Sequence, residues 1–144
     1  MLVHVRPLDL VEVAAVVGAA TRAEWGLRRR TLPATADALG VRLREPAADG
    51  ADAARTADDG TALPDWAVRR AHIAEIVMRR WPLGDTCLRR ALVTGNRLAA
   101  LSPELVIGVR PVTAGARVDA HAWVHVCGVD LDPLAPGYFA LGAP

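Results

Sequence analysis

The chain has 144 residues, a length that predicts one domain with a substantial hydrophobic core. All 17 basic residues are arginine, and the absence of lysine excludes a Schiff-base lysine, a phosphate-loop lysine and a Ser–Lys pair. The single serine, Ser102, precedes Pro103 outside any GxSxG motif, which argues against a serine hydrolase. A net charge of +1, with four Trp, one Tyr and one Phe, argues against nucleic-acid binding.

The N-terminus carries charged residues within its first dozen positions, unlike a secretory signal. The sequence contains no uninterrupted run of about 18 apolar residues, the length that predicts a membrane span. We therefore expect a cytoplasmic protein with no membrane partner. In that reducing compartment Cys87 and Cys127 are expected to be thiols, which makes them candidates for chemistry.

The first 45 residues have the composition of a helical region. Residues 8–25 predict a buried helix, whose apolar residues recur at helical spacing. The face expected to meet the core carries Leu10, Val13, Val17 and Ala20. A shorter helix is expected between Thr31 and Glu45, after Pro33.

Residues 46–62 are rich in Ala, Asp and Gly and contain no branched aliphatic side chain, so they predict a flexible linker. This divides the chain into a helical N-terminal region at 1–45, the linker at 46–62 and a core at 63–144. In the core, one helix is expected from Leu63–Asp65 to the stop at Pro82, and a second from Gly84 to Ser102. Residues 105–109 predict a short buried strand.

From residue 118 the sequence alternates with a period of two, which predicts a strand with one apolar and one polar face. The polar face carries Asp119, His121, Trp123, His125 and Cys127. Gly128 permits a tight turn, after which residues 129–132 return as a partner strand. Helices precede strands along the chain, so the predicted class is α+β.

Cys87 is expected in the first turn of its helix, where the free backbone amides favour a thiolate. That effect is worth about 2 kcal/mol at most, whereas lowering a thiol pKa from about 8.5 to about 5 takes roughly 5 kcal/mol. A reactive Cys87 therefore needs a histidine partner. The alternative is a structural core cysteine.

His121 and His125 lie on the strand with the polar face, so they are better placed than His4 or His72. Their HxxxH spacing resembles a zinc motif, but four residues of strand span about 13 Å, too far for one shared metal. We therefore expect no metal and no cofactor.

A catalytic imidazole also needs a group that orients it. With a two-residue turn at Cys127–Gly128, His125 faces Asp130 and His121 has Asp132 as its diagonal neighbour. A three-residue turn would rotate both aspartates to the opposite face. Asp132 is therefore the first candidate for the acid and Asp130 the second.

Helix-borne Cys, strand-borne His and next-strand Asp occur in this order in transglutaminase-like and papain-like thiol enzymes. The segments CLRRAL from Cys87, LVIGVR from Leu105 and AHAWV from Ala120 resemble the signature blocks of lasso-peptide leader peptidases, which are small transglutaminase-like proteins. The resemblance covers about residues 63–133. The chain departs from that family at His125, where Glu is usual, and at Ser102–Pro103, where Gly is usual.

The resemblance implies a papain-like core, with a helix-borne Cys packed on a small antiparallel sheet, and a cysteine protease that removes the leader of a lasso-peptide precursor. In the match Cys87 is the nucleophile, His121 the general base and acid, and Asp132 the orienting acid. The implied partners are the precursor peptide, a separate leader-binding protein (the RiPP recognition element) and an ATP-dependent cyclase. A chain of 144 residues is expected to leave no room for its own leader-binding domain.

Further candidate residues surround this triad. The Cys87 backbone amide, and Trp81 through its indole N–H, are candidates for the oxyanion site. Arg110, Trp123 and His125 are candidates for contacts with substrate or partner, and Cys127 is expected to be structural. Two other functions are compatible with the sequence: a transglutaminase-like acyltransferase, and a non-catalytic peptide-binding scaffold of a biosynthetic complex.

Overall fold

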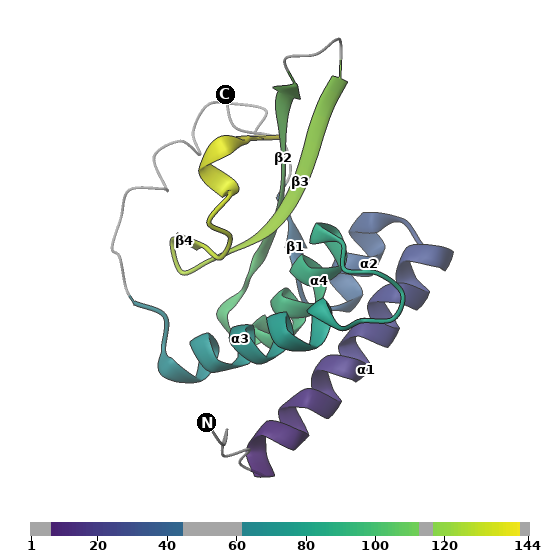
Figure 1. Cartoon of the computed structure of the whole chain (residues 1–144), viewed down its shortest axis with the longest axis vertical. Helices are drawn as coiled ribbons and strands as arrows, with labels where there is room; N and C mark the ends of the chain where they lie inside the picture. The colour runs from purple at the N-terminus through teal and green to yellow at the C-terminus, as the bar shows by residue number, and fades with distance from the viewer. Residues whose placement is uncertain (1–6, 45–61, 113–116, 142–144) are drawn as a thin grey trace.

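The computed structural model describes residues 7–44, 62–112 and 117–141. Helices precede most of the sheet along the chain, which confirms the α+β class (Figure 1). The helices are α1 (Pro7–Arg29), α2 (Leu32–Ala38), α3 (Asp65–Arg79) and α4 (Cys87–Arg97), with short 3-10 helices at Ala99–Leu101 and Ala135–Gly137. The strands are β1 (Arg42–Leu43), β2 (Glu104–Val112), β3 (Arg117–Val126), β4 (Val129–Asp130) and β5 (Phe139–Ala140).

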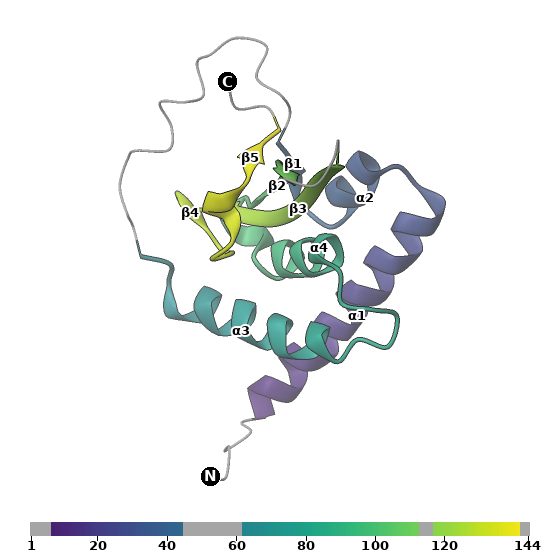
Figure 2. The same ribbon diagram turned by 45° about the horizontal axis from the view of Figure 1, so that its top comes forward.

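Helix α4 forms the centre of the molecule. It lies between the sheet on one side and α1 and α3 on the other (Figure 2). One hydrophobic cluster joins all four helices to the α4 side of β2 and β3, so α1 and α2 share a core with the rest of the described chain. A smaller cluster on the opposite face of the sheet contains Val106, Trp123 and Ala135.

The predicted buried face of α1 is wrong. Leu10, Val13 and Val17 are 63%, 36% and 41% exposed, and only Ala20 of the predicted face is buried. The residues that meet the core are one step around the helix: Val16, Ala19, Ala20 and Ala23.

Ion pairs with α3 and α4 explain this rotation of α1. Asp9 pairs with Arg69, Glu12 with Arg97 at 2.7 Å, and Glu24 with Arg89 at 2.7 Å. Because α1 is apolar on both sides, hydrophobic periodicity alone does not select a face. Its three carboxylates face the arginines, and the small alanines between them allow α1 to pack closely on its neighbours.

The predicted hairpin forms with the predicted turn. His125 is paired with Asp130 and Val126 with Val129, which leaves Cys127 and Gly128 as the two turn residues. Their φ angles are +50° and +76°, the left-handed values that the tight turns of hairpins require.

Strand β4 is shorter than the predicted return strand at 129–132. The Leu131 N–H still donates to the Val124 carbonyl at 2.9 Å. Asp132 then begins a turn, because its side chain accepts the Leu134 N–H at 2.8 Å. Pro133 has no N–H with which to continue the ladder.

The order of the sheet is β1-β2-β3-β4, with β5 pairing with β2. Neither β1 nor β5 was predicted. The predicted second helix ends early, at Ala38, and the chain continues through Gly40, with φ +75°, into β1. Residues 45–61, nearly all of the predicted linker, lie outside the described residues.

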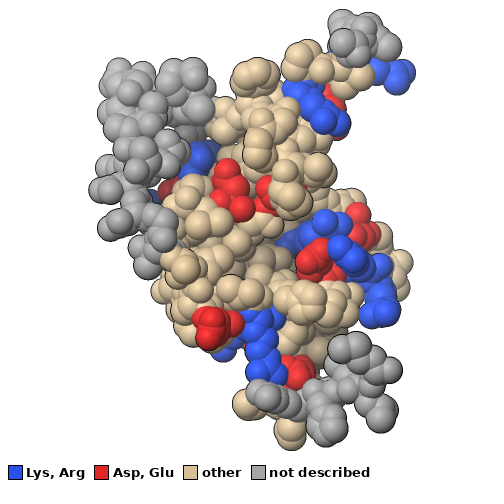
Figure 3. Space-filling view, turned by 60° about the vertical axis from the view of Figure 1, so that its left-hand side comes forward, with Lys and Arg blue, Asp and Glu red and all other residues tan. Residues whose placement is uncertain are grey.

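Acidic and basic side chains are interspersed on the face in Figure 3, where no large patch carries a single sign. Within the described ranges, no helix is long and apolar enough to cross a membrane.

The buried carboxylate of Glu24 provides a test of the α1 packing. Its side chain is 8% exposed and bonds to Arg89 and Arg28. We expect Glu24→Gln to lower the free energy of unfolding by about 2 kcal/mol, measured by urea denaturation at pH 7. The matched control is Glu75→Gln, in an exposed pair with Arg79, for which the expected change is below about 0.5 kcal/mol.

The same variant should show a defined pH dependence. The hydrogen bond from Arg89 is the main cause that lowers the pKa of Glu24 below its ordinary 4.5. The stabilisation is therefore fully present above pH 4.5 and is lost as the pH falls through the lowered pKa. A difference between wild type and Glu24→Gln that grew on acidification would contradict this origin.

Candidate active site

Cys87 is the first residue of α4. Thr86 caps this helix, because its side chain accepts the Arg89 N–H at 3.3 Å. Arg89 donates two hydrogen bonds to Glu24, at 2.7 and 3.1 Å, and Arg90 pairs with Asp85. The start of α4 is thereby fixed to α1 and to the preceding loop. The Cys87 thiol is partly buried beside the unpaired amides of a helix N-terminus.

His121 and Asp132 form a direct pair. His121 Nε2 lies 2.7 Å from Asp132 Oδ2, and both side chains are largely buried. Because Nε2 is engaged by the carboxylate, Nδ1 is the nitrogen left for proton exchange with another group. This is the pairing that the two-residue turn predicts.

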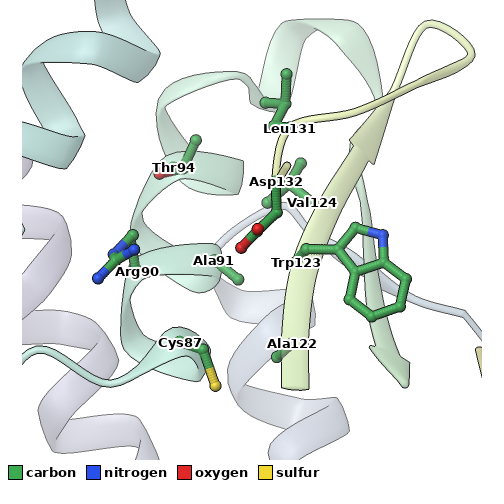
Figure 4. A pocket seen from close by; sticks show the side chains of 9 residues that line it. All are labelled: Cys87, Arg90, Ala91, Thr94, Ala122, Trp123, Val124, Leu131 and Asp132. Atoms are coloured by element: carbon green, nitrogen blue, oxygen red, sulfur yellow. The ribbon is translucent and has the colours of Figure 1, made fainter. Parts of the chain in front are cut away.

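Cys87 and Asp132 lie on one small cavity of about 50 Å³ between α4 and β3. In Figure 4 the Asp132 carboxylate points toward α4, whereas the Trp123 ring points away from the helix. The cavity is lined by Cys87, Arg90, Ala91, Thr94, Ala122, Trp123, Val124, Leu131 and Asp132.

His121 directly precedes one of these lining residues, Ala122. Among the described residues, the Cys87 thiol forms no hydrogen bond with His121. Catalytic hydrogen bonds are often long in a free enzyme and shorten when substrate binds. The structure therefore brings the helix start, the imidazole–carboxylate pair and a small cavity into one region, without an ion pair at the sulfur.

The second aspartate binds other groups. Asp130 Oδ1 accepts the Trp123 indole N–H at 2.9 Å and lies 2.8 Å from His125 Nδ1. Trp123 and His125, two of the residues predicted to contact substrate or partner, therefore have polar groups bonded within the hairpin. Trp123 is also buried. The third, Arg110, bonds to Asp119 at 3.0 Å.

Trp81 remains available as a donor. Its indole N–H is buried and has no hydrogen-bond partner among the described residues. Cys127 is exposed in the hairpin turn. Within the described ranges no three His, Cys, Asp or Glu side chains gather as metal ligands, and His121 and His125 bond to separate aspartates.

Tyr138 is a residue of the site that was not predicted from the sequence. Its ring stacks on the His121 imidazole, with centroids 5.0 Å apart and planes 29° apart. Its hydroxyl donates to Asp119 at 2.8 Å, which is the main cause that raises the pKa of Tyr138 and lowers the pKa of Asp119. The only available signal was that Tyr138 is the one tyrosine of the chain. Its position depends on β5, which crosses to the far side of β2.

Gly108 makes room for these aromatic side chains. It is paired directly with His121 across β2 and β3. A Cβ atom on Gly108 would lie 2.6 Å from ring atoms of Trp123 and 2.9 Å from the Tyr138 Cβ. Glycine is thus required here for lack of space.

Comparisons with known proteins agree with this architecture. Residues 14–133 match the family model of the transglutaminase-like superfamily. No curated protein and no solved structure matches the chain. The family match confirms the predicted transglutaminase-like fold, with its helix-borne Cys against a small sheet.

Substitution of two glycines, one crowded and one exposed, should have opposite effects on the free energy of unfolding. Gly108→Ala should lower the free energy of unfolding by about 1–3 kcal/mol, because the new methyl group displaces Trp123 or Tyr138. Gly18→Ala, on the exposed side of α1 with nothing within 4 Å, should raise it by up to about 1 kcal/mol. Urea denaturation of both variants measures the difference, and equal effects would contradict the close packing at Gly108.

Proposed function

The chain belongs to the transglutaminase-like superfamily, and on that premise we propose that it is a cysteine peptidase that removes the leader from a lasso-peptide precursor. The superfamily commonly contains cysteine-dependent peptidases and acyltransferases. The main support for this proposal is that Asp132, which is paired with His121 at 2.7 Å, lines the same small cavity as Cys87. A scaffold protein has no physical need for such a pair beside a helix-start thiol.

In the proposed reaction, His121 Nδ1 accepts the proton of the Cys87 thiol, and the sulfur attacks the carbonyl carbon of the last leader residue. Backbone N–H groups at the start of α4, including that of Cys87, stabilise the resulting oxyanion. The free indole N–H of Trp81 is a further candidate donor. Asp132 holds the imidazole through Nε2.

Collapse of this intermediate breaks the C–N bond. His121 gives its proton to the departing amine, which becomes the N-terminus of the core peptide, and the leader remains as a thioester on Cys87. Water then attacks the thioester while His121 accepts its proton. The products are a leader carboxylate and the regenerated thiol.

The narrower assignment rests on the sequence blocks around Cys87, Leu105 and Ala120. In this proposal a separate leader-binding protein presents the precursor, and an ATP-dependent cyclase uses the freed amine to close the macrolactam. Membership of the superfamily is equally compatible with acyl transfer, in which an amine replaces water in the last step. The mass of the leader product distinguishes the two, because hydrolysis leaves a free carboxylate and transfer leaves an amide.

Cleavage of the precursor is the first test. We expect the purified protein, with the precursor and leader-binding protein of its own gene cluster, to release a hydrolysed leader detectable by mass spectrometry. Cys87→Ala should lower the rate at least about 1000-fold. The control is Cys127→Asn, since Asn accepts the positive φ of the turn and should leave the rate within about twofold. Equal release by wild type and Cys87→Ala would refute the proposal.

The two aspartates of the hairpin provide a second test. Asp132→Asn should lower kcat by about 100-fold or more, because the amide no longer fixes the imidazole as a carboxylate does. Asp130→Asn, whose partners are Trp123 and His125, should lower it less than about tenfold. The reverse order would assign the acid to Asp130.

A further inference from the structure

The imidazole of His121 is held by more than its carboxylate. One hydrogen bond fixes the position of Nε2 but leaves the ring free to turn about that bond. Tyr138 restricts this rotation, because its ring lies 5.0 Å from the imidazole centroid at an interplanar angle of 29°. Trp123 lies at 6.0 Å and 27° from the same imidazole. Two near-parallel aromatic rings therefore limit the plane that His121 adopts.

Tyr138 is itself anchored. Its hydroxyl donates to Asp119 Oδ2 at 2.8 Å, and Asp119 also accepts from Arg110 at 3.0 Å. The Arg110 guanidinium carbon lies 4.7 Å from the centroid of the Tyr138 ring. Both anchors project from the sheet that carries His121: Arg110 lies on β2 and Asp119 on β3, where the two residues are paired. The phenol ring is thus bonded to a carboxylate on the strand that holds the imidazole.

We propose that Tyr138, held by Asp119 and Arg110, is a positioning residue that holds the His121 imidazole in the plane from which Nδ1 exchanges a proton with the Cys87 thiol. This inference rests on the proposed function, in which His121 is the base. It assigns Arg110 to the support of the catalytic imidazole, in place of the substrate contact suggested by the sequence. Tyr138 also lies beyond residue 133, where the match to the superfamily ends.

The experiment measures thiol reactivity without any peptide substrate. Iodoacetamide alkylation of Cys87 at pH 7 is followed on the tryptic peptide 81–89, which separates it from Cys127 in peptide 118–144. The variants are Tyr138→Leu, which removes the ring, and Tyr138→Phe, which removes only the hydroxyl anchor. Phe139→Leu is the matched control, because Phe139 is the neighbouring aromatic residue and is 72% exposed. His121→Ala defines the rate without the base.

We expect Tyr138→Leu to react about tenfold more slowly than wild type and Tyr138→Phe about threefold more slowly, because a misaligned base loses its effect on the thiol. Phe139→Leu should match wild type. With the precursor peptide, Tyr138→Leu should lower kcat about tenfold and leave KM within about twofold, a split that loss of substrate contacts would not produce.

Circular dichroism shows whether each variant is folded. A folded Tyr138→Leu that reacts as fast as Phe139→Leu would overturn the proposal. If Tyr138→Leu does not fold, Tyr138→Phe decides, and a rate equal to wild type overturns it. If Cys87 reactivity depends on Tyr138 but the precursor stays intact, the positioning role is supported and the peptidase function is refuted. Failure of the proposed function is therefore distinguishable from failure of this inference.

Discussion

The two-residue turn at Cys127–Gly128 is the constraint on which the candidate site depends. Side chains alternate between the two faces of a strand, so the length of this turn decides which face receives Asp130 and Asp132. With two turn residues, both aspartates meet histidines of β3, at 2.8 Å and 2.7 Å. With one more turn residue, positions 130 and 132 would change faces of the sheet, and each aspartate would lose its pairing with a histidine of β3. The turn therefore determines the chemistry of the polar face of the sheet.

The candidate site also requires that the helical layer and the sheet bring their functional side chains close together. The thiol comes from the helical layer and the imidazole–carboxylate pair from the sheet, and α4 connects them (Figure 2). The bonds from Arg89 to the buried Glu24 fix the start of α4 against α1. Because Arg89 is only two residues from Cys87, the packing of α1 helps to fix the position of the Cys87 thiol within the first turn of α4.

The parts of the fold that depend on local pattern were predictable. The alternation of residues 118–127 and the glycine after them predict β3, its turn and the pairing of the two aspartates, because all of these contacts span 11 residues or fewer. The class and the order of the main helices follow from similar signals.

The parts that were missed depend on contacts between distant segments. The face of α1 is selected by ion pairs between residues 60 to 85 positions apart, which periodicity does not detect. Tyr138 reaches His121 only because the chain after Asp132 crosses the sheet to pair with the far edge of β2. Strand β1 has two residues, too few for a periodic signal.

The close packing over Gly108 also limits how this sequence can diverge. Residues 108, 123 and 138 fill one space beside His121, so the size of each limits the size of the other two. A relative with a larger residue at the position of Gly108 should carry a smaller one at the position of Trp123 or Tyr138. These three positions are therefore expected to covary among homologues. They lie on β2, on β3 and directly before β5, and each is 15 residues or more from the others in the chain.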